Sequence, residues 1–154
     1  MATLEGWRYL AVVLDGFSRK VVGSAMADQL QAALVVDALT MALQGRRPAA
    51  GLIHHSDRGG QYTSLAFGEH LRAAGLVASM GSVGDAYDNA VAEAFFSSLK
   101  IELIDRQTWP TRAAARLAIF EYIEVWYNRK RRHSTLGYRS PADYETLTRE
   151  VLVA

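Results

Sequence analysis

The short apolar segment Gly51-Leu52-Ile53 runs directly into the polar stretch His54-His55-Ser56-Asp57-Arg58-Gly59-Gly60-Gln61-Tyr62. The apolar part predicts a buried strand at 51–54, because it is too short and too apolar for an exposed edge. The glycines beyond it let the backbone turn and approach a ligand closely. Ligands of α/β sheets bind beyond the carboxyl ends of such strands, so we predict that Asp57 lies at a functional site.

The rest of the chain alternates between strand and helix patterns. Runs of apolar, β-branched and aromatic residues predict strands at 7–14, 20–26, 51–54 and 77–80. Helical periodicity and capping residues predict helices at 30–44, 63–74, 88–103, 111–128 and from 140 onward. The turn chemistry of 15–19 makes the first two strands an antiparallel hairpin. This order predicts an α/β fold, a mixed sheet with helices packed on it.

The composition limits the class of protein. The chain has 154 residues, 50% of them hydrophobic, which fits one domain with a real core. No apolar run approaches the roughly 18 residues of a membrane span, and the first residues lack the pattern of a secretory signal. Cysteine is absent, which excludes disulfides and thiolate zinc sites from this sequence. These observations predict a cytoplasmic protein with no membrane partner.

The charge is unevenly distributed, although the net charge is only +1. No acidic residue occurs between Val125 and Ala142, and the basic residues there are Arg129, Lys130, Arg131, Arg132 and Arg139. Phosphates are the commonest partners of such a patch. The alternative is a solvated helix end, where the negative end of the helix dipole favours cations. The residues alone leave both interpretations open.

Glu93 is the second carboxylate of interest, and it lies in the helix predicted over 88–103. Seven residues make about two helical turns, so Glu93, Ser97 and Lys100 share one stripe. The apolar residues of this helix lie largely on other faces: Phe95, Phe96 and Leu99. A carboxylate with a lysine two turns on suits a metal beside a phosphate backbone. An ordinary solvated face has the same pattern.

Two histidines beside Asp57 could suggest a zinc site. Adjacent side chains on a strand point to opposite faces, however, so we predict that either His54 or His55 is packed in the interior. His70 and His133 have no ligand-like spacing to this pair.

Several short motifs occur in a fixed order along almost the whole chain: Leu14-Asp15-Gly16-Phe17-Ser18-Arg19, Val22-Gly23, His55-Ser56-Asp57-Arg58-Gly59, Gln61-Tyr62, Asp88-Asn89-Ala90, Glu93, Tyr127-Asn128, Arg132-His133, Leu136-Gly137-Tyr138 and Ser140-Pro141. Together they resemble the integrase-core transposases of bacterial insertion sequences. These are the second-frame transposases whose catalytic domain is similar to that of retroviral integrases. Each motif alone is weak. Their order, and the 35 residues (58–92) between Asp57 and Glu93, make the resemblance specific.

The resemblance implies a ribonuclease-H-like fold with a D-D-E site that holds two Mg²⁺ or Mn²⁺ ions. It also implies cleavage and transfer of DNA strands at insertion-sequence ends. By the match, Asp57 and Glu93 are the second and third catalytic carboxylates and the metal ligands. The residues expected to contact DNA or support the site are Lys100, Arg58, Gln61, Asn89, Arg129, Lys130, Arg131, Arg132 and His133.

The first carboxylate departs from the family's pattern. In the family it lies on the first strand, upstream of the segment that matches Glu5-Gly6-Trp7, whereas this chain begins at Met1. We therefore expect the first strand and its catalytic Asp to be missing. Asp15 is no replacement, since it matches a turn residue and can cap its own turn. The strands at 7–14 and 51–54 then lack their shared neighbour. Unpaired buried backbone groups cost about 1–3 kcal/mol each, so the chain alone is expected to be inactive or unstable.

We predict an integrase catalytic core over 1–145, incomplete at its N-terminus, and a C-terminal tail over 146–154. Its expected partners are insertion-sequence ends, target DNA, and further copies of itself or a full-length transposase. Its expected place is the bacterial cytoplasm, at the nucleoid when acting. One alternative is a non-catalytic remnant that binds nucleic acid through 129–139 and joins full-length transposase subunits. A third interpretation is a ribonuclease-like hydrolase on the same fold.

Overall fold

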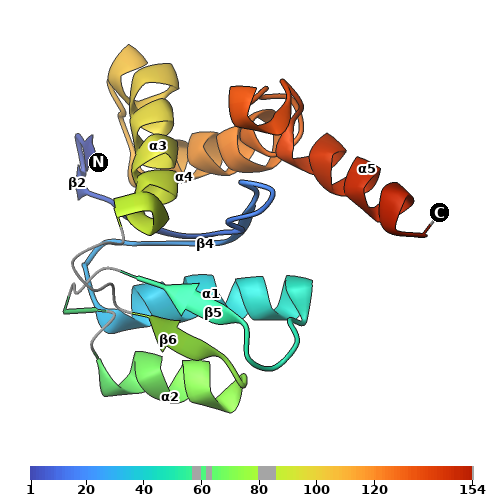
Figure 1. Cartoon of the computed structure of the whole chain (residues 1–154). Helices are drawn as coiled ribbons and strands as arrows, with labels where there is room; N and C mark the ends of the chain where they lie inside the picture. The colour runs from blue at the N-terminus through green and yellow to red at the C-terminus, as the bar shows by residue number, and fades with distance from the viewer. Residues whose placement is uncertain (57–59, 62–63, 80–85, 154) are drawn as a thin grey trace.

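Figure 1 shows a computed structural model of the chain that describes residues 1–56, 60–61, 64–79 and 86–153, with only the backbone at 86–89 and 152–153. The strands are β1 (Ala2–Thr3), β2 (Gly6–Trp7), β3 (Tyr9–Leu14), β4 (Val21–Ala27), β5 (Ile53–His55) and β6 (Val77–Ser79). The α-helices are α1 (Ala32–Arg46), α2 (Leu65–Ala73), α3 (Ala86–Glu102), α4 (Arg112–Glu121) and α5 (Pro141–Val153). Three short segments are the 3₁₀ helices η1 (Ile104–Arg106) and η3 (Ser134–Leu136) and the π-helix η2 (Tyr122–Tyr127).

The antiparallel pair β3–β4 separates two apolar cores. Odd-numbered residues of β3 face the first core, with α1 and α2, and even-numbered residues face the second, with α3, α4 and η2. Alternate side chains of a strand point to opposite faces. Because both faces are covered, β3 consists wholly of apolar and aromatic residues. Figure 1 shows this layering, with α3 and α4 above β4 and α1, β5, β6 and α2 below it.

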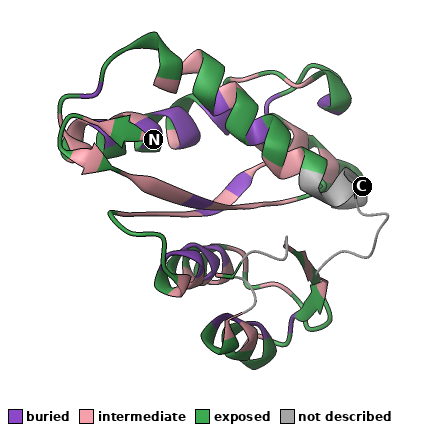
Figure 2. Ribbon diagram, turned by 90° about the vertical axis from the view of Figure 1, so that its left-hand side faces the viewer, coloured by how far each residue is buried: buried purple, intermediate pink, exposed green. Residues whose placement is uncertain are grey.

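Helix α1 lies against β4 at very short range. An ideal Cβ added to Gly23 of β4 would lie 2.9 Å from the Cβ of Ala42 and would overlap the carbonyl oxygen of Ala38. Only glycine permits this approach of strand and helix. Figure 2 shows buried residues along the ladder and on the helix faces turned toward it. Five residues of α1 are buried against this side of the ladder: Leu34, Val35, Ala38, Leu39 and Ala42.

Strands β5 and β6 form a separate parallel ladder, with Ile53 opposite Val77. The prediction that the strand at 51–54 is buried is wrong, because Leu52 and Ile53 are 55% and 52% exposed and only the face with His54 packs on α2. In the part of the chain that the structure describes, the strands make three two-stranded sheets, so the predicted mixed sheet is divided. The third sheet, β1–β2, is extended by Met1 and Arg8, whose backbone groups exchange hydrogen bonds of 2.7 and 2.9 Å. Within that part, no strand joins β3 to β5. The absence of the family's first strand stays a prediction.

Three helix starts predicted from capping residues are confirmed. The hydroxyl groups of Ser64, Thr111 and Ser140 each accept a hydrogen bond from the backbone N–H three residues on, at 3.3, 3.0 and 3.2 Å. Each bond satisfies a donor that the first helical turn leaves unpaired. The starts of α2, α4 and α5 were therefore readable from single residues.

Other boundaries differ from the prediction. Helix α3 begins at Ala86, two residues before the predicted start at 88. The helix predicted over 111–128 changes type after Glu121, and the N–H of Asn128 bonds to the carbonyl of Ile123 at 3.0 Å, five residues back. The wider turn keeps the core-facing side chains of η2 buried, so tertiary packing overrides the α-helical period.

The C-terminal helix α5 runs without a break across the predicted boundary between 145 and 146. Residues 146–153 therefore continue the last helix of the core. No helix in the described ranges is long and apolar enough to cross a membrane.

We predict that Gly23→Ala destabilises the fold by roughly 1–3 kcal/mol, because the added methyl group must push α1 away from β4. Gly16→Ala is the matched control, since an added Cβ in that turn has nothing within 4 Å. Urea unfolding followed by circular dichroism measures both variants. Equal unfolding midpoints would show that α1 does not press on β4 so closely.

Candidate functional site

The polar stretch at 54–62 connects the end of β5 to the start of α2. The N–H of Ser56 donates to the carbonyl of Ser79 at 3.1 Å, which continues the parallel ladder by one residue. Gln61 is half-buried, and its carbonyl accepts a hydrogen bond from Ser64 Oγ at 2.8 Å. Asp57 and Arg58 lie outside the described residues. The structure thus fixes the chain on both sides of them.

The two histidines at the end of β5 point to opposite faces, as predicted. The His54 ring packs edge-on against Phe67 of α2, with 5.4 Å between the ring centroids. Burial, and to a lesser extent the nearby charge of His55, lowers the pKa of His54. Its Nε2 is buried without a hydrogen-bond partner in the described chain. His55 is exposed, so His54 is the packed member of the pair.

Helix α3 presents the predicted stripe to solvent. Glu93, Ser97 and Lys100 are all exposed. Phe95 and Leu99 are buried in the second core, as predicted. Phe96, which was predicted to lie largely on another face, is exposed as well. The backbone of Asn89 also belongs to α3, and its side chain lies outside the described part.

Carboxylates elsewhere do not complete a metal site within the described ranges. There, no group of three histidine, aspartate or glutamate side chains could hold a metal ion. Asp15 caps its own turn as predicted, because its Oδ1 accepts hydrogen bonds from the N–H groups of Phe17 and Ser18 at 2.9 and 3.2 Å. Glu93 offers the hard oxygen ligands that Mg²⁺ takes. Its expected partner Asp57 lies in one of the gaps.

The basic segment divides into an exposed part and an engaged part. The exposed basic residues are Arg129, Lys130, Arg132 and, farther along the chain, Arg139. Arg131 is half-buried, and its Nε donates to Glu102 Oε1 at 2.9 Å while its Nη2 donates to Ser98 Oγ at 3.0 Å. Its guanidinium also lies over the Tyr127 ring, 5.8 Å from the centroid. Arg131 therefore braces α3 against the segment that follows η2.

Glu102 collects three donors on one carboxylate. The Tyr122 hydroxyl donates at 2.8 Å, Trp126 Nε1 at 3.1 Å and Arg131 Nε at 2.9 Å. Burial pushes the pKa of Glu102 up, but these hydrogen bonds, led by that of Arg131, lower it below its ordinary value. Burial and the bond to Glu102 raise the pKa of Tyr122. The partners lie 20 to 29 residues apart on separate elements, so no local spacing in the sequence indicates this cluster.

His133 adds no charge to the basic segment at neutral pH. Its ring packs edge-on against Tyr127, with 5.1 Å between the centroids. Burial, followed by the charges of Arg131 and Arg19, lowers the pKa of His133 to about 4. The ring is therefore neutral at pH 7.

We predict that acid weakens the fold through His133. An unfolded histidine has a pKa of about 6.5, above the folded value of about 4, so the unfolded chain takes up the proton first. The stability that the neutral ring contributes is complete above roughly pH 6.5 and is lost as the pH falls toward 4. His133→Gln removes the titrating ring. Its urea midpoint should therefore change less than that of the wild type between about pH 7 and pH 4. Equal changes in the two proteins would contradict the prediction.

Two stretches of the chain, residues 1–86 and 93–148, match family models described as integrase core domain. The chain is 48% identical over 143 residues to the transposase for insertion sequence element IS904 of Lactococcus lactis subsp. lactis (strain IL1403). It is 46% identical over 145 residues to the transposase InsF for insertion sequence IS3A of Escherichia coli (strain K12). The alignments cover 93% and 94% of this chain but 56% and 50% of those proteins. The chain thus spans about half the length of the curated relatives it matches.

Solved structures support the fold. The match to the catalytic core domain of BIV integrase covers 100% of this chain and 94% of the integrase chain, with a TM-score of 0.64 at 20% identity. A second match is to a chain of the simian T-cell lymphotropic virus intasome in complex with PP2A regulatory subunit B56 gamma. It covers 94% of this chain and 50% of the intasome chain, with a TM-score of 0.69 at 14% identity. The mixed α/β arrangement thus resembles retroviral integrase catalytic cores, the ribonuclease-H-like class expected from the sequence. Integrase core domain models match most of this chain, and insertion-sequence transposases are 42–48% identical to it. The chain therefore belongs to the integrase core domain family.

Proposed function

We propose that this chain carries part of a metal-dependent site that cleaves and transfers DNA strands at insertion-sequence ends. The observation that carries the proposal is the 42–48% identity to insertion-sequence transposases over 93–94% of the chain. The geometry supports it at two points. The stretch containing Asp57 follows the carboxyl end of β5, and α3 exposes Glu93 on a stripe with Lys100.

Asp57 and Glu93 are the residues that would hold the metal, and their donor chemistry fits it. Carboxylate oxygens suit Mg²⁺ and Mn²⁺. When bound, a pair of such ions supplies activation of the attacking water or 3′-hydroxyl and stabilisation of the leaving oxygen. Lys100, two turns beyond Glu93, would bind a DNA phosphate beside the carboxylates. The remaining residues that would hold DNA there are Arg58, Gln61 and Asn89.

The site would be incomplete without a further carboxylate. Among the described residues no group of three acidic or histidine side chains could hold a metal ion, and Asp15 is engaged with its own turn. The family's first carboxylate would come from a segment outside this sequence, in the same protein or in another subunit. Alone, the chain would bind DNA without cutting it.

A purely binding role is the second candidate, favoured by the exposed cations of the basic segment. Arg129, Lys130 and Arg132 are exposed, and no acidic residue occurs between Val125 and Ala142. Such a role needs no metal. It would let the chain associate with copies of itself or with full-length transposase on DNA. A ribonuclease-like hydrolase on this fold is separated from both by offering RNA–DNA hybrids.

Binding of Mn²⁺ tests the two carboxylates. We expect Asp57→Asn and Glu93→Gln each to weaken Mn²⁺ binding by roughly tenfold or more, because loss of a mere supporting residue already has an effect of that size. Asp37→Asn, on the exposed side of α1, is the matched control and should bind as the wild type does. Titration calorimetry measures all four proteins. Equal Mn²⁺ affinities in all four proteins would exclude Asp57 and Glu93 as metal ligands and would leave the purely DNA-binding role as the proposal.

Cleavage of labelled duplex DNA carrying an insertion-sequence end tests whether the site is complete. With Mg²⁺ or Mn²⁺, we expect the chain to shift the DNA in a gel without nicking it, because one carboxylate is lacking. Nicking by the wild-type chain that disappears in Asp57→Asn would instead show a complete site within this sequence.

A further inference from the structure

The loop after the basic segment presents an aromatic ring to solvent. His133 and Arg139 form an antiparallel bridge that closes the loop. The N–H of His133 donates to the carbonyl of Arg139 at 3.1 Å, and the N–H of Tyr138 donates to the carbonyl of His133 at 2.9 Å. Leu136 is buried and anchors the loop to the interior. The backbone is therefore held in place, and Tyr138 projects from it.

Tyr138 is 71% exposed, more than any other aromatic side chain that the structure describes. Its φ of 59° follows a φ of 62° at Gly137, so two consecutive residues are left-handed. A bulky residue rarely adopts this conformation, and such strain is concentrated where a function requires it. Within the described chain, the ring stacks on no other aromatic side chain. Aromatic stacking among the described residues therefore does not account for the conformation.

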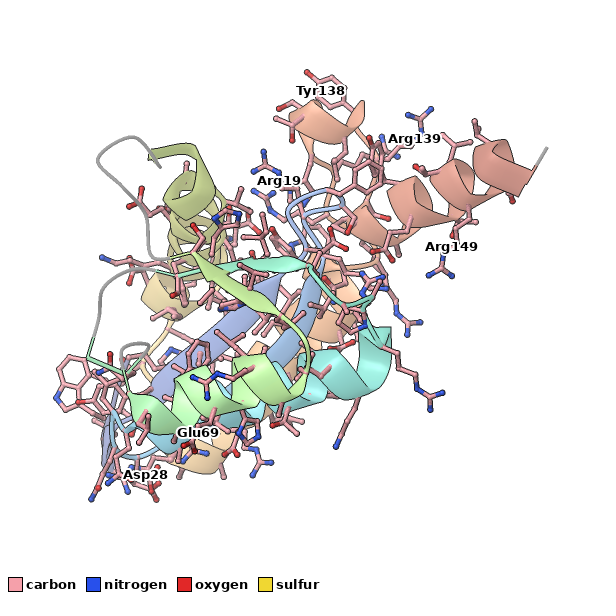
Figure 3. All side chains as sticks on the ribbon, turned by 60° about the horizontal axis from the view of Figure 1, so that its bottom comes forward. Arg19, Asp28, Glu69, Tyr138, Arg139 and Arg149 are labelled. Atoms are coloured by element: carbon pink, nitrogen blue, oxygen red, sulfur yellow. The ribbon has the colours of Figure 1, made fainter. Side chains whose placement is uncertain are left out.

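Two arginines lie at the same end of the molecule as Tyr138. The Nη1 atom of Arg139 lies 3.0 Å from the position of a Cβ on Gly137, so the guanidinium is held against the same loop. Arg19, at the turn between β3 and β4, comes from a distant part of the chain, and its charge reaches His133. Figure 3 shows Tyr138 at one end of the molecule, with Arg19 and Arg139 to either side below it in that view.

Arg19 and Arg139 have no ion-pair partner among the described residues. Glu102 pairs instead with Arg131, and Glu145 pairs with Lys20 and Arg46. The exposed ring therefore shares this end of the molecule with two guanidinium groups that remain available to an anion.

We propose that Tyr138, Arg19 and Arg139 bind an unpaired nucleotide of DNA, with the base stacked on the ring and the flanking phosphates on the arginines. Aromatic rings beside cations are the recurring arrangement for single-stranded nucleic acid. In a duplex the base faces are covered by their neighbours, so a single ring selects an unpaired base. The inference rests on the proposed role at insertion-sequence ends, where cleavage produces strand ends.

Binding of a single strand by Tyr138→Gly tests the proposal, because glycine adopts the left-handed conformation freely and leaves the loop unstrained. The probe is labelled oligothymidine of about 12 nucleotides, with a blunt duplex of equal length as the control, both measured by fluorescence anisotropy. Affinity for the single strand should fall roughly 5- to 100-fold, the range for loss of one stacked base. Affinity for the duplex should stay unchanged, and Tyr138→Phe, which keeps a ring, should bind the single strand as the wild type does.

The other outcomes are distinguishable. Equal single-strand affinities of wild type and Tyr138→Gly overturn this inference and leave the proposed function standing. Parallel losses on single strand and duplex, or a change only in oligomeric state, also overturn it, since they indicate a general defect or a contact between protein copies. A wild-type chain that binds neither DNA overturns the proposed function as well.

Discussion

Asn128 joins three parts of the molecule through its side chain and its backbone carbonyl. It is only 2% exposed, and its Oδ1 accepts the N–H of Val21 at 2.9 Å while its Nδ2 donates to the carbonyl of Val21 at 3.0 Å. The amide thereby pairs with β4 as a neighbouring strand would. The backbone carbonyl of Asn128 accepts the N–H of Ala142 at 2.9 Å, at the start of α5. The basic segment begins at the next residue, Arg129. The hydrogen bonds of Asn128 therefore fix where this segment starts relative to the core.

The β3–β4 ladder determines how the proposed site is assembled. Strand β5, which leads to Asp57, packs through His54 on α2 and the first core, whereas α3, which carries Glu93, closes the second. The two proposed metal ligands therefore come from opposite sides of the ladder. The short contact at Gly23 sets the layer on one side, and the pairing of Asn128 sets the layer on the other. Packing at Gly23 and Asn128 thus positions the layers that contain β5 and α3.

The sequence predicts the fold wherever the deciding contacts are local. The caps of three helices and the turn at Asp15 act within three residues, so their residue types alone were sufficient. The stripe containing Glu93 followed from the helical period. In contrast, Asn128 pairs with a residue 107 positions away and Arg131 with one 29 positions away, which no local pattern encodes. A run of basic residues has the same sequence pattern whether its side chains are solvated or bonded to other residues. The pattern therefore does not indicate that Arg131 bonds to α3. The first strand and first carboxylate were expected from the resemblance alone, and periodicity had no bearing on them.

The π-helix at Tyr122–Tyr127 gives the segment that continues α4 room for an additional residue. Each residue turns an α-helix by about 100°, and the wider π-helical turn absorbs that rotation. Loss of one exposed residue from this turn, such as Val125, would restore the α-helical period and leave Asn128 facing nearly the same way, toward Val21. Insertions and deletions are tolerated in surface turns. The wide turn extends this tolerance to a helix that packs on the core, so the chain can lose one residue there without separating β4 from α5.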